Sequence, residues 1–145
     1  MQLKDLGMAG ALAFSAIGSA LGTGVAGMAA VGAWKKAFAQ SKTAPFVLTV
    51  FVGAPLTQTI YGMIVMNTLI SSVANGSYFW GAGIFSGLAM GTSAWMQGKA
   101  GAAAADAMGE TGKGFGNYLI VLGVIETVAL FVMVFIMMGV GKITG

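Results

Sequence analysis

The sequence contains no cysteine, no histidine and no arginine, and only two of its 145 residues are proline. The absence of cysteine and histidine excludes disulfides, thiolate nucleophiles, histidine-ligated metals and Ser-His or Cys-His catalysis. We therefore expect no catalytic site in the chain itself. Charge is also scarce, because charged residues make up 8% of the chain, against about 25% in ordinary soluble domains. The seven lysines form no long basic stripe, so nucleic-acid binding is not indicated.

Hydrophobic residues make up 57% of the chain, which predicts that its solvent is lipid. A spanning helix needs about 20 mostly apolar residues. A polar turn, Ala74-Asn75-Gly76-Ser77, divides one long uncharged run into two such stretches. The first stretch exceeds the apolar core of a cleaved signal peptide, so we expect it to be retained. The sequence thus predicts an all-α membrane protein with four spans, at about 7–33, 45–72, 79–108 and 117–141.

Lysine placement predicts the orientation of these spans. The first and third connections should lie on one side of the membrane, and both termini with the second connection on the other. Four lysines belong to the first set and two lie beside the termini; in order, these are Lys35, Lys36, Lys42 and Lys113, and then Lys4 and Lys142. We expect the first and third connections to be cytoplasmic, in a plasma-membrane protein.

Two of the spans carry stripes of small residues, which allow helix backbones to approach closely. The stripes consist of Gly18, Gly22, Ala26 and Ala30 in the first span and Gly83, Gly87 and Gly91 in the third. A slim helix followed by a bulkier one thus occurs twice. This pattern favours one membrane domain over residues 1–145, built from two tandem helical hairpins at about 7–72 and 79–141. The stripes suit either a compact monomer or an inner ring of helices in an oligomer.

The last span contains one charged residue, Glu126. It follows Asn117 by nine residues, which places it roughly 14 Å into a hydrocarbon core about 30 Å thick. An acid at that depth is a functional candidate, and it needs a polar partner. The alternative is a permanently protonated packing residue.

Polar residues in two other spans are expected at the same depth. In the second span, Ala54, Thr57, Gln58 and Tyr61 follow the spacing of one helical face. In the third, Gln97 faces Glu126 if the hairpin turns near residues 111–112. Each of these groups alone suits ordinary hydrogen bonding between or within helices. Together their oxygens form a ligand set for a hard cation.

The second span also contains Pro55, which cannot donate a backbone hydrogen bond to the carbonyl of Phe51. The expected distortion of the helix turns a main-chain oxygen toward the site.

These residues resemble the c- or K-type proteolipid of rotary V-type and A-type ATPases over essentially the whole chain. The resemblance rests on the doubled hairpin, the glycine-rich first and third spans, residues 55–62, Met96-Gln97-Gly98-Lys99 and Ile125-Glu126-Thr127. It differs from the family's usual pattern at Ile125, where Pro often precedes the acid, and at Leu56, where Gly is commoner. Both differences concern helix geometry and leave the side-chain ligands intact.

The resemblance implies a homo-oligomeric rotor ring that binds one Na⁺ per protomer. Its ligands would be Thr57, Gln58, Gln97, Glu126 and the main-chain carbonyl of Ala54. Tyr61 would hydrogen-bond the carboxylate of Glu126. Sodium is favoured over H⁺ because all five side chains are present.

The implied partners are identical subunits, a stator membrane subunit, a central-stalk subunit and lipid. The stalk would dock on the loop that carries Lys35, Lys36 and Lys42. Three alternatives stay open: a proton-translocating rotor of the same architecture, a small multidrug/proton antiporter, and a structural or pore-forming proteolipid. The sequence leaves two roles open for Lys99, which either lines the lumen of a ring or reaches toward Asp106.

Overall fold

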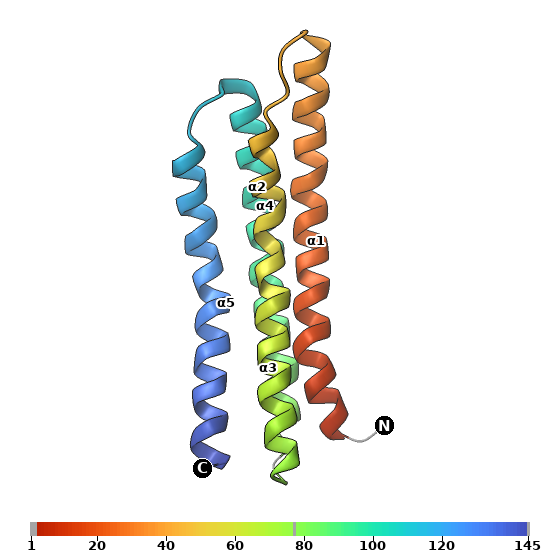
Figure 1. Ribbon diagram of the computed structural model, residues 1–145, viewed down its shortest axis with the longest axis vertical. Helices are drawn as coiled ribbons and strands as arrows, with labels where there is room; N and C mark the ends of the chain where they lie inside the picture. Colours follow the sequence, from red (N-terminus) through yellow and green to blue (C-terminus); the bar gives the residue numbers. More distant parts are fainter. Residues whose placement is uncertain (1–2, 77, 145) are drawn as a thin grey trace.

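The computed structural model describes residues 3–76 and 78–144, and within these ranges the chain is helical, with no β-strand. Its elements are α1 (Leu3–Ala39), η1 (Phe46–Leu48), α2 (Thr49–Gly53), η2 (Ala54–Leu56), α3 (Thr57–Ala74), α4 (Trp80–Thr111) and α5 (Phe115–Thr144). The short elements and α3 continue one another, so four long rods stand side by side (Figure 1). The all-helical prediction is confirmed. Ser77, in the predicted turn, lies outside the described residues.

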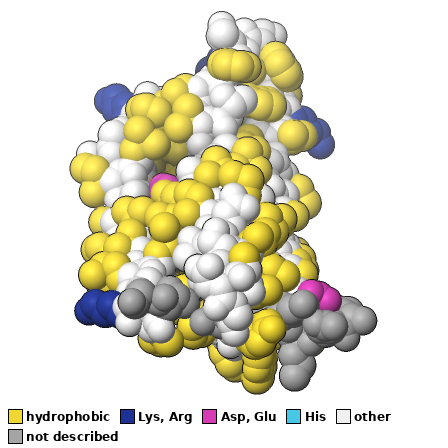
Figure 2. Space-filling view, turned by 60° about the horizontal axis from the view of Figure 1, so that its bottom comes forward, with side chains coloured by type: hydrophobic (Ala, Val, Ile, Leu, Met, Phe, Trp, Pro, Cys, Tyr) yellow, Lys and Arg dark blue, Asp and Glu magenta, His cyan; other side chains and the backbone are white. Residues whose placement is uncertain are grey.

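The rods form two hairpins whose connecting loops lie at one end of the bundle, with both chain termini at the other (Figure 1). Three stretches are long and apolar enough to cross a membrane: Asp5–Ala39, Phe46–Ala74 and Phe115–Ile143. They correspond to the first, second and fourth predicted spans. Most of the surface in Figure 2 is hydrophobic or uncharged. The chain is therefore a membrane protein.

The predicted third span coincides with α4, which is long enough to cross a membrane but is not among the three apolar stretches. Its composition explains this result. Gly, Ser and Ala occupy much of the helix, and the polar side chain of Gln97 lies near its middle. Its crossing of the membrane stays a prediction. Helix α4 makes its most extensive contact with α1, so protein rather than lipid covers much of its surface.

The contact between α1 and α4 depends on glycines that face each other. A Cβ atom added to Gly18 would lie 2.0 Å from the carbonyl oxygen of Gly91, and one added to Gly98 would lie 2.2 Å from the Cα of Gly22. Farther along, a Cβ on Gly101 would lie 3.5 Å from that of Ala26. The small-residue stripes thus meet each other within one chain. That contact accounts for them without a second copy.

Proline 55 interrupts the second rod. Residues 54–56 form a 3₁₀ turn between α2 and α3, as expected where a backbone donor is missing. The carbonyl oxygen of Phe51 lies against α4, where a Cβ on Gly101 would be 2.9 Å from it. At the preceding loop, Trp34 Nε1 donates a hydrogen bond of 2.9 Å to the carbonyl of Pro45. Because of this interruption, α3 starts at Thr57, and Gln58 is its second residue.

Two apolar clusters form the core, one toward each end of the bundle. The cluster near the termini is built from Ala11, Val65, Leu69, Met90, Ala129 and Val140. The cluster near the loops is built from Ala30, Leu48, Phe51, Ala104, Ala105 and Leu122. Gln58 lies between the two clusters along the second rod, and Gln97 lies between them along α4. These two polar side chains are thus enclosed by apolar packing on both sides.

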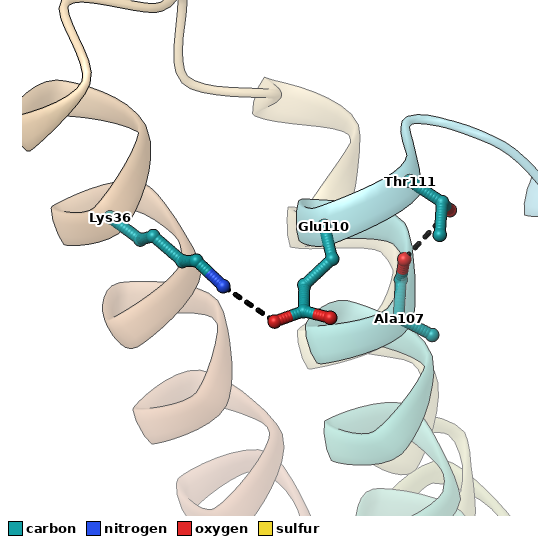
Figure 3. A network of polar contacts seen from close by, with 4 residues as sticks. All are labelled: Lys36, Ala107, Glu110 and Thr111. Carbon is teal, nitrogen blue, oxygen red and sulfur yellow. Dashed lines mark hydrogen bonds and ion pairs between the residues drawn. The ribbon is translucent and has the colours of Figure 1, made fainter.

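At the loop end, the Lys36 ammonium of α1 pairs with the Glu110 carboxylate of α4 (Figure 3). Hydrogen bonding and attraction from Lys36 lower the pKa of Glu110. A carboxyl whose pKa is lowered by folding stabilises the folded state above its unfolded pKa, and that contribution is lost as the pH falls through the lowered value. Because both groups are exposed, the contribution is small.

Substitution of Gly18 by Ala should separate α1 from α4, because the new methyl group would overlap the backbone of Gly91. We expect a loss of about 1–3 kcal/mol of stability, seen as a lower melting temperature of the helical signal in detergent. Gly24→Ala is the matched control in the same helix, since a Cβ there meets nothing within 4 Å. Equal melting of the two variants would contradict this packing.

The Lys36–Glu110 pair predicts a pH-dependent difference between the wild type and Glu110→Gln. Near pH 6 the wild type should melt at a slightly higher temperature, since only its Glu110 is charged. The difference should shrink as the pH falls below the unfolded carboxyl pKa of about 4.3, and the two melting temperatures should converge once the pH passes below the lowered pKa of Glu110. A difference that persists unchanged at pH 3 would mean that the ion pair is not its source.

Candidate ion-binding site

The candidate site lies where α3, α4 and α5 meet, and Glu126 of α5 is its one carboxylate. Tyr61 of α3 donates its hydroxyl proton to Glu126 Oε1 at 2.8 Å. Gln97 Nε2 of α4 donates to Glu126 Oε2 at 3.3 Å. Each carboxylate oxygen therefore has a donor from a different helix. Glu126 itself is half-buried.

Two fully buried amides continue this network away from the carboxylate. Gln58 and Gln97 both have 0% of their surface exposed. Gln58 Nε2 donates to Gln97 Oε1 at 2.8 Å, and Gln97 Nε2 also donates to the carbonyl of Leu122 at 3.0 Å. A buried amide without partners would cost free energy. Here Gln97 joins both hairpins, because Gln58 belongs to the first and Glu126 to the second.

Thr57 ends the chain of hydrogen bonds. Its hydroxyl lies 3.1 Å from Gln58 Oε1 and 3.1 Å from the carbonyl oxygen of Ala54. One hydroxyl proton can serve only one of these two acceptors at a time. The 3₁₀ turn ends directly before Thr57. The carbonyl oxygen of Ala54 and Gln58 Oε1 therefore both lie near the Thr57 hydroxyl. The site thus gathers carboxylate, amide, hydroxyl and main-chain oxygens.

The structure brings together all six residues that the sequence singled out around Glu126. Close polar contacts connect Ala54, Thr57, Gln58, Gln97 and Glu126 in that order, and Tyr61 is bound to the carboxylate. These contacts form one polar cluster among η2, α3, α4 and α5, between the two apolar clusters of the core.

Sequence analysis missed contacts that position the Glu126 helix. Ser93, 6% exposed, donates its hydroxyl to the carbonyl of Ile125 at 2.9 Å. With the bond from Gln97 to Leu122, it gives α4 two attachments to the α5 backbone beside Glu126. The available signal was spacing, since Ser93 lies one helical turn before Gln97 on the same face. These bonds matter because few residues of α5 are buried against the rest of the bundle.

The lysines expected to bind a stalk differ in their surroundings. All three are exposed, but Lys36 is paired with Glu110, whereas Lys35 and Lys42 form no ion pair within the described part of the chain. Lys99 places its ammonium 4.0 Å from the ring centroid of Trp95, one turn earlier in α4, which is a cation–π contact.

The fold and the site define a class: a helical membrane protein that holds a single carboxylate among buried neutral polar groups. Residues 80–139, which span most of the second hairpin, match the family model of the ATP synthase C subunit. The match covers less than half of the chain and leaves out the first hairpin. It supports a proteolipid of the rotor of an ATP synthase or related rotary ATPase, a part that translocates ions. A comparison with curated proteins gives no significant match.

The Ser93 contact predicts a local change in α5. In Ser93→Ala the carbonyl of Ile125 loses a side-chain donor worth about 1 kcal/mol, so backbone amides around Glu126 should exchange hydrogen about five times faster. Ser86→Ala is the matched control, because Ser86 is also buried in α4 but donates to Gly83 of its own helix. Equal exchange of α5 in both variants would show that Ser93 does not hold it.

Proposed function

We propose that the chain is the rotor-ring subunit of a V-type, sodium-translocating ATPase or ATP synthase, with one Na⁺ carried per protomer at Glu126. The observation that supports this proposal is the pair of fully buried amides beside the carboxylate. A proton carrier needs a carboxyl group and little more. Two buried glutamines and a threonine hydroxyl supply the neutral oxygens that an alkali cation needs in place of water.

The charge balance of the site suits a monovalent cation. Glu126 contributes one negative charge, and Thr57, Gln58, Gln97 and the Ala54 carbonyl contribute none. One Na⁺ therefore neutralises the site as a whole. A neutral site can pass through lipid during rotation at far lower cost than a bare carboxylate at the same depth.

The hydrogen bonds of the structure suit the carboxylate when no cation is bound. Tyr61 and the Gln97 amide then hold its two oxygens. When Na⁺ is present, the ion takes over part of this compensation. Loading and release thus exchange one set of favourable contacts for another, so that neither state leaves the acid unpaired.

We further propose that identical copies of the chain assemble into a ring beside a stator subunit, and that the α1–η1 and α4–α5 loops face the cytoplasm at the plasma membrane. A cleft of about 550 Å³ lies between these loops and includes Lys36, Lys42 and Glu110 in its lining. Its mixed charge suits a protein partner, the central stalk. Lys35, Lys42 and Lys113 are exposed cations at this end of the bundle and are available to that partner.

Carbodiimide labelling tests the choice of ion. In membranes that carry the full chain, a hydrophobic carbodiimide should modify Glu126, and Na⁺ should slow the reaction by occupying the site. Glu110 is an internal control, because its exposed carboxylate lies at the loop end and its labelling should not respond to Na⁺. Glu126→Gln should abolish the labelling at this position and the ion-coupled ATPase activity.

The other outcomes distinguish the alternatives. Labelling of Glu126 that responds to pH but not to Na⁺ would indicate a proton-translocating rotor. Normal ion-coupled activity in Glu126→Gln would indicate a structural or pore-forming role. Drug-dependent protection of Glu126 would favour a multidrug antiporter.

A further inference from the structure

Ser19 of α1 has a buried hydroxyl without a hydrogen-bond partner among the described residues. Its side chain is 2% exposed, and its Oγ is the one fully enclosed side-chain polar atom of the described chain that has no partner. The other buried serine of α1, Ser15, donates its hydroxyl to the carbonyl of Ala11 at 2.8 Å. An orphaned buried hydroxyl is unusual and calls for a physical account.

The register of α1 against the second rod places Ser19 opposite Gln58. A Cβ on Gly62 would lie 2.6 Å from Ser15 Oγ, and a Cβ on Gly22 would lie 2.9 Å from Pro55 Cβ. Residues 15, 19 and 22 are spaced i, i+4 and i+7 along α1. Residues 62, 58 and 55 have the same spacing in the opposite direction. The middle members of these antiparallel faces, Ser19 and Gln58, therefore share one level.

Gln58 has one amide hydrogen that is not used in a hydrogen bond among the described residues. Its amide nitrogen carries two hydrogens, and one of them is bonded to Gln97 Oε1. Gln58 Oε1 points the other way, within 3.1 Å of the Thr57 hydroxyl. The amide is fully buried, so water from outside does not reach its second N–H group.

We propose that Ser19 is a positioning residue of the ion site, which accepts the second N–H of Gln58 through one buried water. In this arrangement the Ser19 hydroxyl turns so that its own proton reaches the carbonyl of Ser15, four residues earlier, in the way that Ser15 bonds the carbonyl of Ala11. The hydroxyl then offers this water only an acceptor. The amide is thereby held with its nitrogen toward α1 and its oxygen toward Thr57 and the cation.

This inference rests on the proposed sodium function and deepens it, because it brings α1 into a site otherwise built from the second rod, α4 and α5. Without the Ser19 hydroxyl, only the bond to Gln97 Oε1 holds the nitrogen of the Gln58 amide, so the amide rotates more readily and presents its NH₂ group to the cation in part of the population. The site then loses a ligand and gains a repulsive contact. The carboxylate keeps Tyr61 and Gln97 in either case, so the cation-free site is unaffected.

The test measures the Na⁺ concentration that halves carbodiimide labelling of Glu126 in membranes carrying the full chain. We expect Ser19→Ala to raise this concentration about tenfold, as loss of one partner of a buried amide implies. Its labelling rate without Na⁺ should equal that of the wild type. Ser15→Ala is the matched control, one turn away on the same face, and should leave both quantities unchanged.

A double-mutant cycle separates positioning from general loosening of the bundle. In a Gln58→Leu background the amide is absent, so adding Ser19→Ala should cause no further change in Na⁺ protection. Full additivity there, equal shifts in Ser15→Ala and Ser19→Ala, or an unshifted Ser19→Ala would each overturn the role of Ser19 while leaving the sodium function intact. Absence of Na⁺ protection in the wild type would overturn both.

Discussion

The structure is organised around one carboxylate in the middle of a long apolar helix, α5. Glu126 cannot be hydrated at its expected depth, so its polar compensation has to come from neighbouring helices. Tyr61 and Gln97 bind its two oxygens, and the need to satisfy Gln97 in turn brings in Gln58 and the carbonyl of Leu122. Each added polar group creates a further requirement for a partner. The network therefore extends across both hairpins.

The contact between α1 and α4 makes this network possible. Gly18 and Gly91 let the two backbones meet. Helix α3 then packs against α1, and α5 packs against α4. The close approach also explains why α4 is less hydrophobic than the other long helices. A helix covered by protein does not need a continuous apolar surface. The same close packing allows α4 to carry Gln97 and Ser93 without exposing them to lipid.

Much of the fold was predictable because helix formation in lipid is a local requirement. Every backbone polar group must be satisfied within its own segment, so apolar length and turn residues located the helical rods to within a few residues. The residues around Glu126 were predictable for a related reason. Periodicity placed Thr57, Gln58 and Tyr61 near one face, and equal distance from a turn placed Gln97 at the depth of Glu126.

The sequence by itself determined that there would be four helices, that one acid would lie deep within them, and which polar residues could accompany it. Only the tertiary structure decided which atoms meet: that Ser93 holds the backbone beside Glu126, that Lys36 is engaged by Glu110, and that Ser19 lies opposite Gln58. Spacing along one helix defines a face. The rotation and register of one helix against another depend on packing between residues distant in the chain, such as Gly22 against Pro55, which no local pattern contains.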